Sequence, residues 1–67
     1  MFKVSRKTIF WDRKKEDYVE YTFESRVYSR YKTALRKAMK WFRVTDLVTI
    51  EDQKGFRLVT LKKGKYA

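Results

Sequence analysis

A chain of 67 residues must build its core from few side chains, and this one has no cysteine that could cross-link it. Domains of about this size bury only ~60% of the surface that the unfolded chain exposes, and many rely on disulfides or a metal. The large side chains here are aromatic: five Phe, five Tyr and two Trp. Each ring can remove roughly 150–250 Å² from water. We therefore expect a single folded domain over residues 1–67, stabilised mainly by aromatic packing.

The residue types that are missing exclude much of the usual active-site chemistry. There is no His and no Cys, so no imidazole proton shuttle, thiolate nucleophile or sulfur-bound zinc can form. We expect no catalytic residue, no cofactor and no metal site. The longest apolar run is Ile9-Phe10-Trp11, which is too short for a membrane span or a signal peptide. We therefore expect a cytoplasmic protein with no membrane partner.

Two stretches near the start of the chain predict a β-hairpin. Residues 2–11 are rich in β-branched and aromatic types, and residues 18–24 alternate strictly between two sets of side chains. Residues 12–17 are all charged and suit the loop between the strands, although they include no Gly or Asn. We expect a β-bulge where the alternation of the first strand slips. The side chains expected to face the core are Val19, Tyr21 and Phe23.

A helix follows, preceded by a junction over residues 25–28. Its apolar side chains recur at spacings of three and four, which defines one helical face. We expect Ser29, in preference to Ser25, to cap its N-terminus. The residues of the apolar face are Tyr31, Ala34, Leu35, Ala38, Met39 and Phe42.

Residues 44–51 and 56–61 predict a second hairpin. Asp52 and Gly55 stand at the first and fourth positions of the stretch between them, as in a type I turn. The element order is then β-hairpin, helix, β-hairpin. We expect an α+β fold: a four-stranded antiparallel sheet with one basic amphipathic helix packed on one face. Residues 62–67 are expected to form a frayed basic tail.

The positive charge of the chain is concentrated around the helix. The formal net charge is +10, and residues 25–43 hold seven basic residues and no acidic one. Cations four residues apart repel each other on a helix, and cations in its first turn oppose the helix dipole. An anionic partner would remove this destabilisation, whereas the simplest alternative is a solvated face without a partner. The residues expected to contact such a partner are Arg30, Lys32, Arg36, Lys37, Lys40, Trp41 and Arg43.

Apolar side chains exceed what one helix can cover. Adjacent apolar pairs such as Phe10-Trp11 and Leu58-Val59 place apolar groups on both faces of the sheet. The uncovered face could form a homodimer, stack single-stranded bases or dock onto another protein. Trp11 and Tyr18 are the residues that we expect on this surface.

One short stretch resembles a known motif. Residues 54–59, Lys-Gly-Phe-Arg-Leu-Val, look like the start of RNP1 of the RNA-recognition motif, which places stacking aromatics on a strand. Arg57 stands where that motif has a small residue, and Leu58 stands where it has its second aromatic. The order of elements also differs from that family. We therefore interpret the stretch as a hairpin turn followed by a strand, and assign no family.

Asp52 and Lys54 are spaced like the acidic-x-Lys element of metal-dependent nucleases. Such a site needs further carboxylates around a metal ion, for which Asp46 and Glu51 are the nearest candidates in the sequence. Asp and Lys are also common in tight turns, and we favour that interpretation.

Two functions of different classes fit these features. The first is a small non-enzymatic module that binds nucleic acid, DNA or RNA, through its phosphates and with low sequence specificity. The second is a protein-binding regulator or inhibitor. It would dock its basic helix and aromatic face on an acidic surface of a larger protein, such as a nucleic-acid enzyme.

Overall fold

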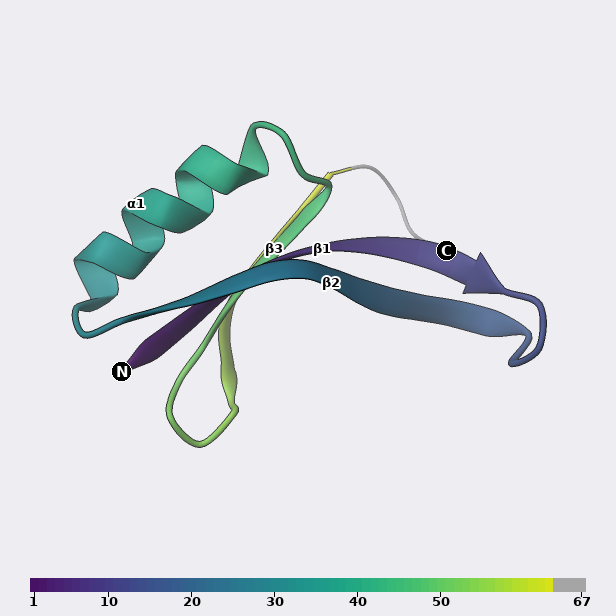
Figure 1. The fold of residues 1–67 in the computed structure, drawn as a ribbon, viewed down its shortest axis with the longest axis horizontal. Coiled ribbons are helices and arrows are strands. Elements are labelled where there is room, and N and C mark those ends of the chain that lie inside the picture. The colour runs from purple at the N-terminus through teal and green to yellow at the C-terminus, as the bar shows by residue number, and fades with distance from the viewer. Residues whose placement is uncertain (64–67) are drawn as a thin grey trace.

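The computed structural model describes residues 1–63 and contains four strands and one helix (Figure 1). The strands pair in the order β2-β1-β3-β4, and every neighbouring pair is antiparallel. The helix packs against this sheet, so the predicted α+β fold is confirmed. Among residues 1–63, no helix is long and apolar enough to cross a membrane. The elements are β1 (Phe2–Asp12), β2 (Asp17–Tyr28), α1 (Tyr31–Phe42), β3 (Leu47–Glu51) and β4 (Arg57–Lys62).

The core lies between α1 and one face of the sheet. On β1 and β3, alternate residues point toward the helix, because Val4 pairs with Ile50 and Arg6 pairs with Val48. Small alanine side chains on α1 let the helix approach the sheet closely. The buried members of this core are Val4, Ala34, Ala38, Trp41, Val48 and Ile50.

The apolar face of the helix is turned slightly from the predicted one. Ala34 and Ala38 are buried as expected, but Trp41 joins them in the core while Met39 is 56% exposed. The helix begins at Tyr31 and its N-cap is Arg30, so the prediction of a Ser29 cap is wrong. The α1–β3 connection extends to residue 46, because the strand that we expected from residue 44 begins only at Leu47.

The first hairpin is longer than the sequence indicated. Residues 25–28, which we expected to be a junction, continue β2 and pair with β1 up to Phe2. A strand of 12 residues spans about 40 Å, whereas a helix of 12 residues spans only about 18 Å. The hairpin therefore continues well past the end of α1 (Figure 1). For this reason Tyr21 and Phe23 are not covered by the helix, contrary to our prediction, and both remain about half exposed.

Two irregularities bend the sheet. Between Arg6 and Lys7 the pairing moves from Glu24 to Thr22, so that Phe23 has no residue opposite it. The bulge that we expected in the first strand, where Ile9, Phe10 and Trp11 are consecutive, is absent, since these residues pair regularly; the bulged residue is Phe23 on β2. A second shift in register lies between Ile50 and Glu51, where β3 pairs with β4. Bulges of this kind increase local twist and bend the strands that carry them.

The bend brings four charged side chains together on the face without a helix. Lys7 Nζ lies 3.2 Å from Glu20 Oε1 and 3.9 Å from Glu51 Oε1. Arg57 donates two hydrogen bonds to the Glu20 carboxylate, at 3.0 and 3.2 Å. Because Glu20 lies on β2 and Arg57 on β4, these bonds connect the two outer strands, and this face must be concave. We call these four residues the charged cluster.

Small polar residues cross the sheet between the two ends of the charged cluster. Ser25, Ser5, Thr49 and Thr60 occupy one row of paired positions across all four strands. The Ser5 and Ser25 hydroxyl groups hydrogen-bond to each other at 2.8 Å, and Thr49 is fully buried. This row of the concave face is therefore formed by small polar side chains.

The end of the chain is ordered further than we expected. Lys62 is the last residue of β4, and the backbone N–H of Lys63 donates a 2.9 Å hydrogen bond to the carbonyl of Asp46. The predicted frayed tail therefore does not include these two lysines. The rest of that prediction, residues 64–67, lies outside the described part of the chain.

The charged cluster makes stability depend on pH. Hydrogen bonds from Arg57 hold the pKa of Glu20 below its ordinary value. Partial burial opposes this lowering, and the hydrogen bond from Lys7 adds to it. A carboxylate whose pKa is lowered by folding stabilises the fold above its unfolded pKa of about 4.3, and this contribution is lost as the pH falls through the folded pKa. We expect Glu20→Gln to lower the free energy of unfolding by about 1 kcal/mol at neutral pH.

Urea denaturation across the acidic range tests this expectation. The difference between wild type and Glu20→Gln should narrow as the pH falls from about 5 to about 3. Glu16→Gln is the matched control, because Glu16 is exposed in the β1–β2 turn and forms no ion pair within residues 1–63. If both substitutions lowered the free energy of unfolding equally, the role given to the cluster would be contradicted. The same holds if the difference in stability between wild type and Glu20→Gln did not change with pH.

Candidate anion-binding site on the helix

Four cations lie on the side of α1 that faces away from the sheet. At about 100° per residue, their positions fall opposite the buried Ala34 and Ala38. All four are exposed. We call this surface the basic face, formed by Lys32, Arg36, Lys40 and Arg43.

Within residues 1–63, no carboxylate balances the basic face. The ion pairs of the described chain involve only sheet residues, with Glu20, Glu24 and Glu51 as the acidic partners. Within residues 1–63, none of the four cations forms an ion pair or a side-chain hydrogen bond. The reason is already present in the sequence, because residues 25–43 contain no acidic side chain. The basic face is therefore free to bind an external anion.

The structure separates two of the predicted contact residues from this face. Trp41 is only 9% exposed and belongs to the core, so its assignment to the contact surface is wrong. Lys37 is half-buried, and its Nζ lies 4.9 Å from the centroid of the Trp41 ring. A cation over an aromatic face is stabilised there, which makes Lys37 less available to a partner. Arg30 is exposed at the N-cap and can extend the basic face by one residue.

The first turn of α1 is electrostatically unfavourable. No side chain caps the N-terminus and no acidic residue lies in the first turn, where Arg30 and Lys32 instead place positive charge near the positive end of the helix dipole. The last turn is favourable, since Lys40 lies near the negative end. The N-terminal end of the helix therefore carries a destabilising arrangement of charge, which a single acidic or capping residue would relieve.

The predicted aromatic surface lies on the part of the hairpin that extends past the helix. Trp11 and Tyr18 are directly paired across β1 and β2, and their rings meet edge to face with centroids 5.2 Å apart. Both are about half exposed. They point to the same face as Ile9 and Glu20, which is the concave face, whereas the basic face lies on the other side of the sheet.

A second set of exposed rings lies on the helix side of the same hairpin. Phe10, Tyr21 and Phe23 are each about half exposed, and the Tyr21 and Phe23 rings are 5.3 Å apart. We expected Tyr21 and Phe23 to be buried, and this surface was therefore not predicted. The signal that could have found it is the length of the alternating pattern, which exceeds what a helix of three turns covers.

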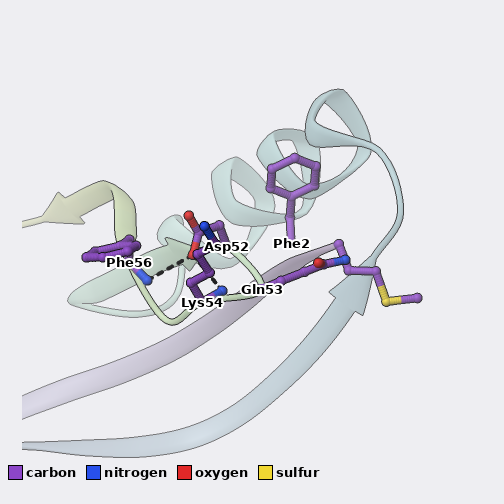
Figure 2. Close-up of a pocket in the computed structure, with 6 residues that line it drawn as sticks. Phe2, Asp52, Gln53, Lys54 and Phe56 are labelled. Carbon is purple, nitrogen blue, oxygen red and sulfur yellow. Dashed lines mark hydrogen bonds between the residues drawn. The ribbon is translucent and has the colours of Figure 1, made fainter.

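The β3–β4 turn accounts for the two motifs found around residue 52. Asp52 accepts hydrogen bonds at 2.9 Å from the backbone N–H groups of Lys54 and Phe56 (Figure 2). The N–H of Gly55 donates to the Asp52 carbonyl at 3.1 Å, as the predicted turn requires, and Gly55 has φ +86°. One Asp52 carboxylate oxygen is thus used to hold the turn. Among residues 1–63, no group of three His, Cys, Asp or Glu side chains is arranged to hold a metal ion.

The pocket beside this turn is shallow and mixed in character. Figure 2 shows Phe2, Gln53 and Phe56 around it, on both sides of the Asp52 carboxylate. Phe56, the aromatic residue of the RNP1-like stretch, lies in the turn and not on the strand. Leu58 is exposed while Val59 packs against the core. The stretch therefore does not present paired rings on a sheet face.

Comparisons of the chain with protein-family models, with curated proteins and with solved structures found no match. Function must therefore be inferred from the geometry and charge described above.

The N-terminus of α1 offers a direct test of whether its charges serve stability. Arg30→Asp supplies a capping carboxylate and removes a cation from the positive end of the dipole. We expect the free energy of unfolding to increase by about 1 kcal/mol. Chemical denaturation measures the change, and Arg30→Ala separates loss of charge from gain of a cap. An unchanged or lower stability of Arg30→Asp would show that Arg30 stabilises the helix.

Proposed function

We propose that this protein is a non-enzymatic module that binds nucleic acid mainly through phosphate contacts of the basic face. The observation that supports the proposal is the set of four exposed cations on one side of α1 without a carboxylate partner in the described chain. Each phosphate bound there releases condensed counterions, which favours association. Arg30 extends the surface at the start of the helix.

The dimensions of the basic face suit a polyanion better than a single small anion. Residues 32–43 extend about 16 Å along the helix axis, at about 1.5 Å per residue. Duplex DNA carries one negative charge for each ~1.7 Å of its axis, so several phosphates lie within that length. Contacts of Lys and Arg to phosphate oxygens carry no sequence information. Binding is therefore expected to be only weakly sequence-specific.

A second candidate is the protein-binding regulator, and one observation favours it. Met39 is 56% exposed and lies on the same side of α1 as Arg36 and Arg43. Methionine and arginine are both enriched at protein interfaces. In that case the basic face would dock on an acidic protein surface, with the hairpin aromatics or a homodimer contact beside it. We also propose a cytoplasmic location, which the absence of Cys suits.

The proposal predicts a large loss of affinity when the basic face is reversed. Arg36→Glu combined with Lys40→Glu should weaken binding to any nucleic-acid sequence by at least about tenfold near 100 mM salt. The negative slope of log affinity against log salt should become shallower by about two, because two phosphate contacts are lost. Fluorescence anisotropy with labelled duplexes of unrelated sequence measures both quantities.

A matched double variant controls for net charge. Lys3 and Lys54 are exposed and lie outside the helix, so Lys3→Glu with Lys54→Glu changes the net charge equally but leaves the basic face intact. We expect this control to bind much more tightly than the Arg36 and Lys40 variant. Equal losses would mean that only overall charge matters. Absence of wild-type binding near physiological salt would refute the nucleic-acid proposal and favour an acidic protein partner.

A further inference from the structure

A cleft lies between the α1–β3 connection and the long hairpin, on the side of the sheet that carries α1. Figure 1 shows the hairpin continuing past the end of the helix at this point. The hairpin and the connection each contribute three residues. We call it the Arg6 cleft, and it is lined by Arg6, Thr8, Phe23, Val44, Thr45 and Asp46.

Arg6 is held in a fixed position in this cleft. Its guanidinium carbon lies 5.6 Å from the centroid of the Phe23 ring and 5.9 Å from that of the Trp41 ring. Its Nε lies 3.4 Å from Glu24 Oε1. Neither terminal nitrogen has a hydrogen-bond partner within residues 1–63, and the side chain is 34% exposed. These nitrogens are therefore oriented donors that a ligand can use without breaking an existing bond.

The charge of the cleft selects against a second phosphate site. Glu24 already neutralises Arg6, and the lining residue Asp46 adds another carboxylate. A phosphate would meet these carboxylates as well as the guanidinium group, whereas a neutral group with hydrogen-bond acceptors would not be repelled. The hydroxyl group of Thr45, which is buried, also lacks a hydrogen-bond partner in the described chain. The cleft is thus suited to a neutral, polar ligand.

The apolar part of the cleft is suited to a flat ring. Phe23 is 52% exposed and Val44 is 76% exposed, although both are large apolar residues. The Tyr21 ring meets Phe23 edge to face and extends the aromatic surface along the hairpin. Half-exposed rings next to a cation are the arrangement on which unpaired bases stack.

We infer that the Arg6 cleft binds a base of a single-stranded nucleic acid. The base stacks on Phe23, and its carbonyl or ring-nitrogen acceptors receive hydrogen bonds from the terminal nitrogens of Arg6. The inference rests on the proposed function, because the base in the cleft would belong to a strand whose phosphates contact the basic face. Arg43 of that face directly precedes the cleft residue Val44 in the sequence. A base within a duplex is stacked and paired, and cannot enter the cleft without being unpaired.

Two labelled probes separate binding of bases from binding of phosphates. One is a single strand of mixed sequence, and the other is an abasic strand with the same number of phosphates. Wild type is expected to bind the mixed strand at least about fivefold more tightly near 100 mM salt. Phe23→Ala should remove this preference and leave the affinity for the abasic strand unchanged. Phe23→Leu keeps an apolar side chain without a flat ring, and should lose the preference as well.

Phe56→Ala is the matched control, because Phe56 is 66% exposed in the β3–β4 turn and does not line the cleft. It should keep the full preference. Equal binding of the two probes by wild type, or a preference that survives in both Phe23 variants, would overturn the inference. The proposed function would still stand if Arg36→Glu with Lys40→Glu weakened both probes. If neither probe bound to wild type, the proposed function and the inference would both be wrong.

Discussion

The bend of the sheet sets the shape on which the rest of the molecule depends, and the charged cluster of Lys7, Glu20, Glu51 and Arg57 spans it. The cluster connects the two outer strands across the concave face, and it buries a lysine whose charge two carboxylates balance. A sheet bent in this way can hold a short helix against its other face. It also leaves the far half of the first hairpin uncovered. The helix-side aromatics lie on this uncovered half, whereas the basic face lies on the helix itself.

The distribution of carboxylates explains why the sheet and the helix differ in charge balance. The acidic partners of the ion pairs are on β2 and β3, and Asp52 holds a turn. The acidic side chains thus stabilise the sheet and its loops, while the helix has only cations. The cations of the helix, which form no ion pair within residues 1–63, are therefore the groups available to the polyanion that we propose as partner.

The sequence predicted the element order, the β3–β4 turn and the exposed cations of the helix, because each depends on local patterns. Trp41 shows where the helical pattern was misread. It follows Ala34 by seven residues and Ala38 by three, so a wheel places it on their side of the helix, where it joins the core. Phe23 shows a second limit, since its exposure depends on the length of β2 relative to α1. The charged cluster was not predictable at all, because Glu20 and Arg57 are distant in the chain and meet only when the sheet bends.

The most direct test of this account is a residue-by-residue map of nucleic-acid binding in solution. Isotope-labelled protein would be titrated with a mixed-sequence single strand while its backbone amide resonances are followed by NMR. The account predicts the largest shift changes at residues 30–46 and around Phe23, with little change at Ser5 and Thr49 on the concave face. Shift changes centred on the concave face or on β4 would contradict it. An absence of shift changes at a saturating concentration of the nucleic acid would contradict it as well.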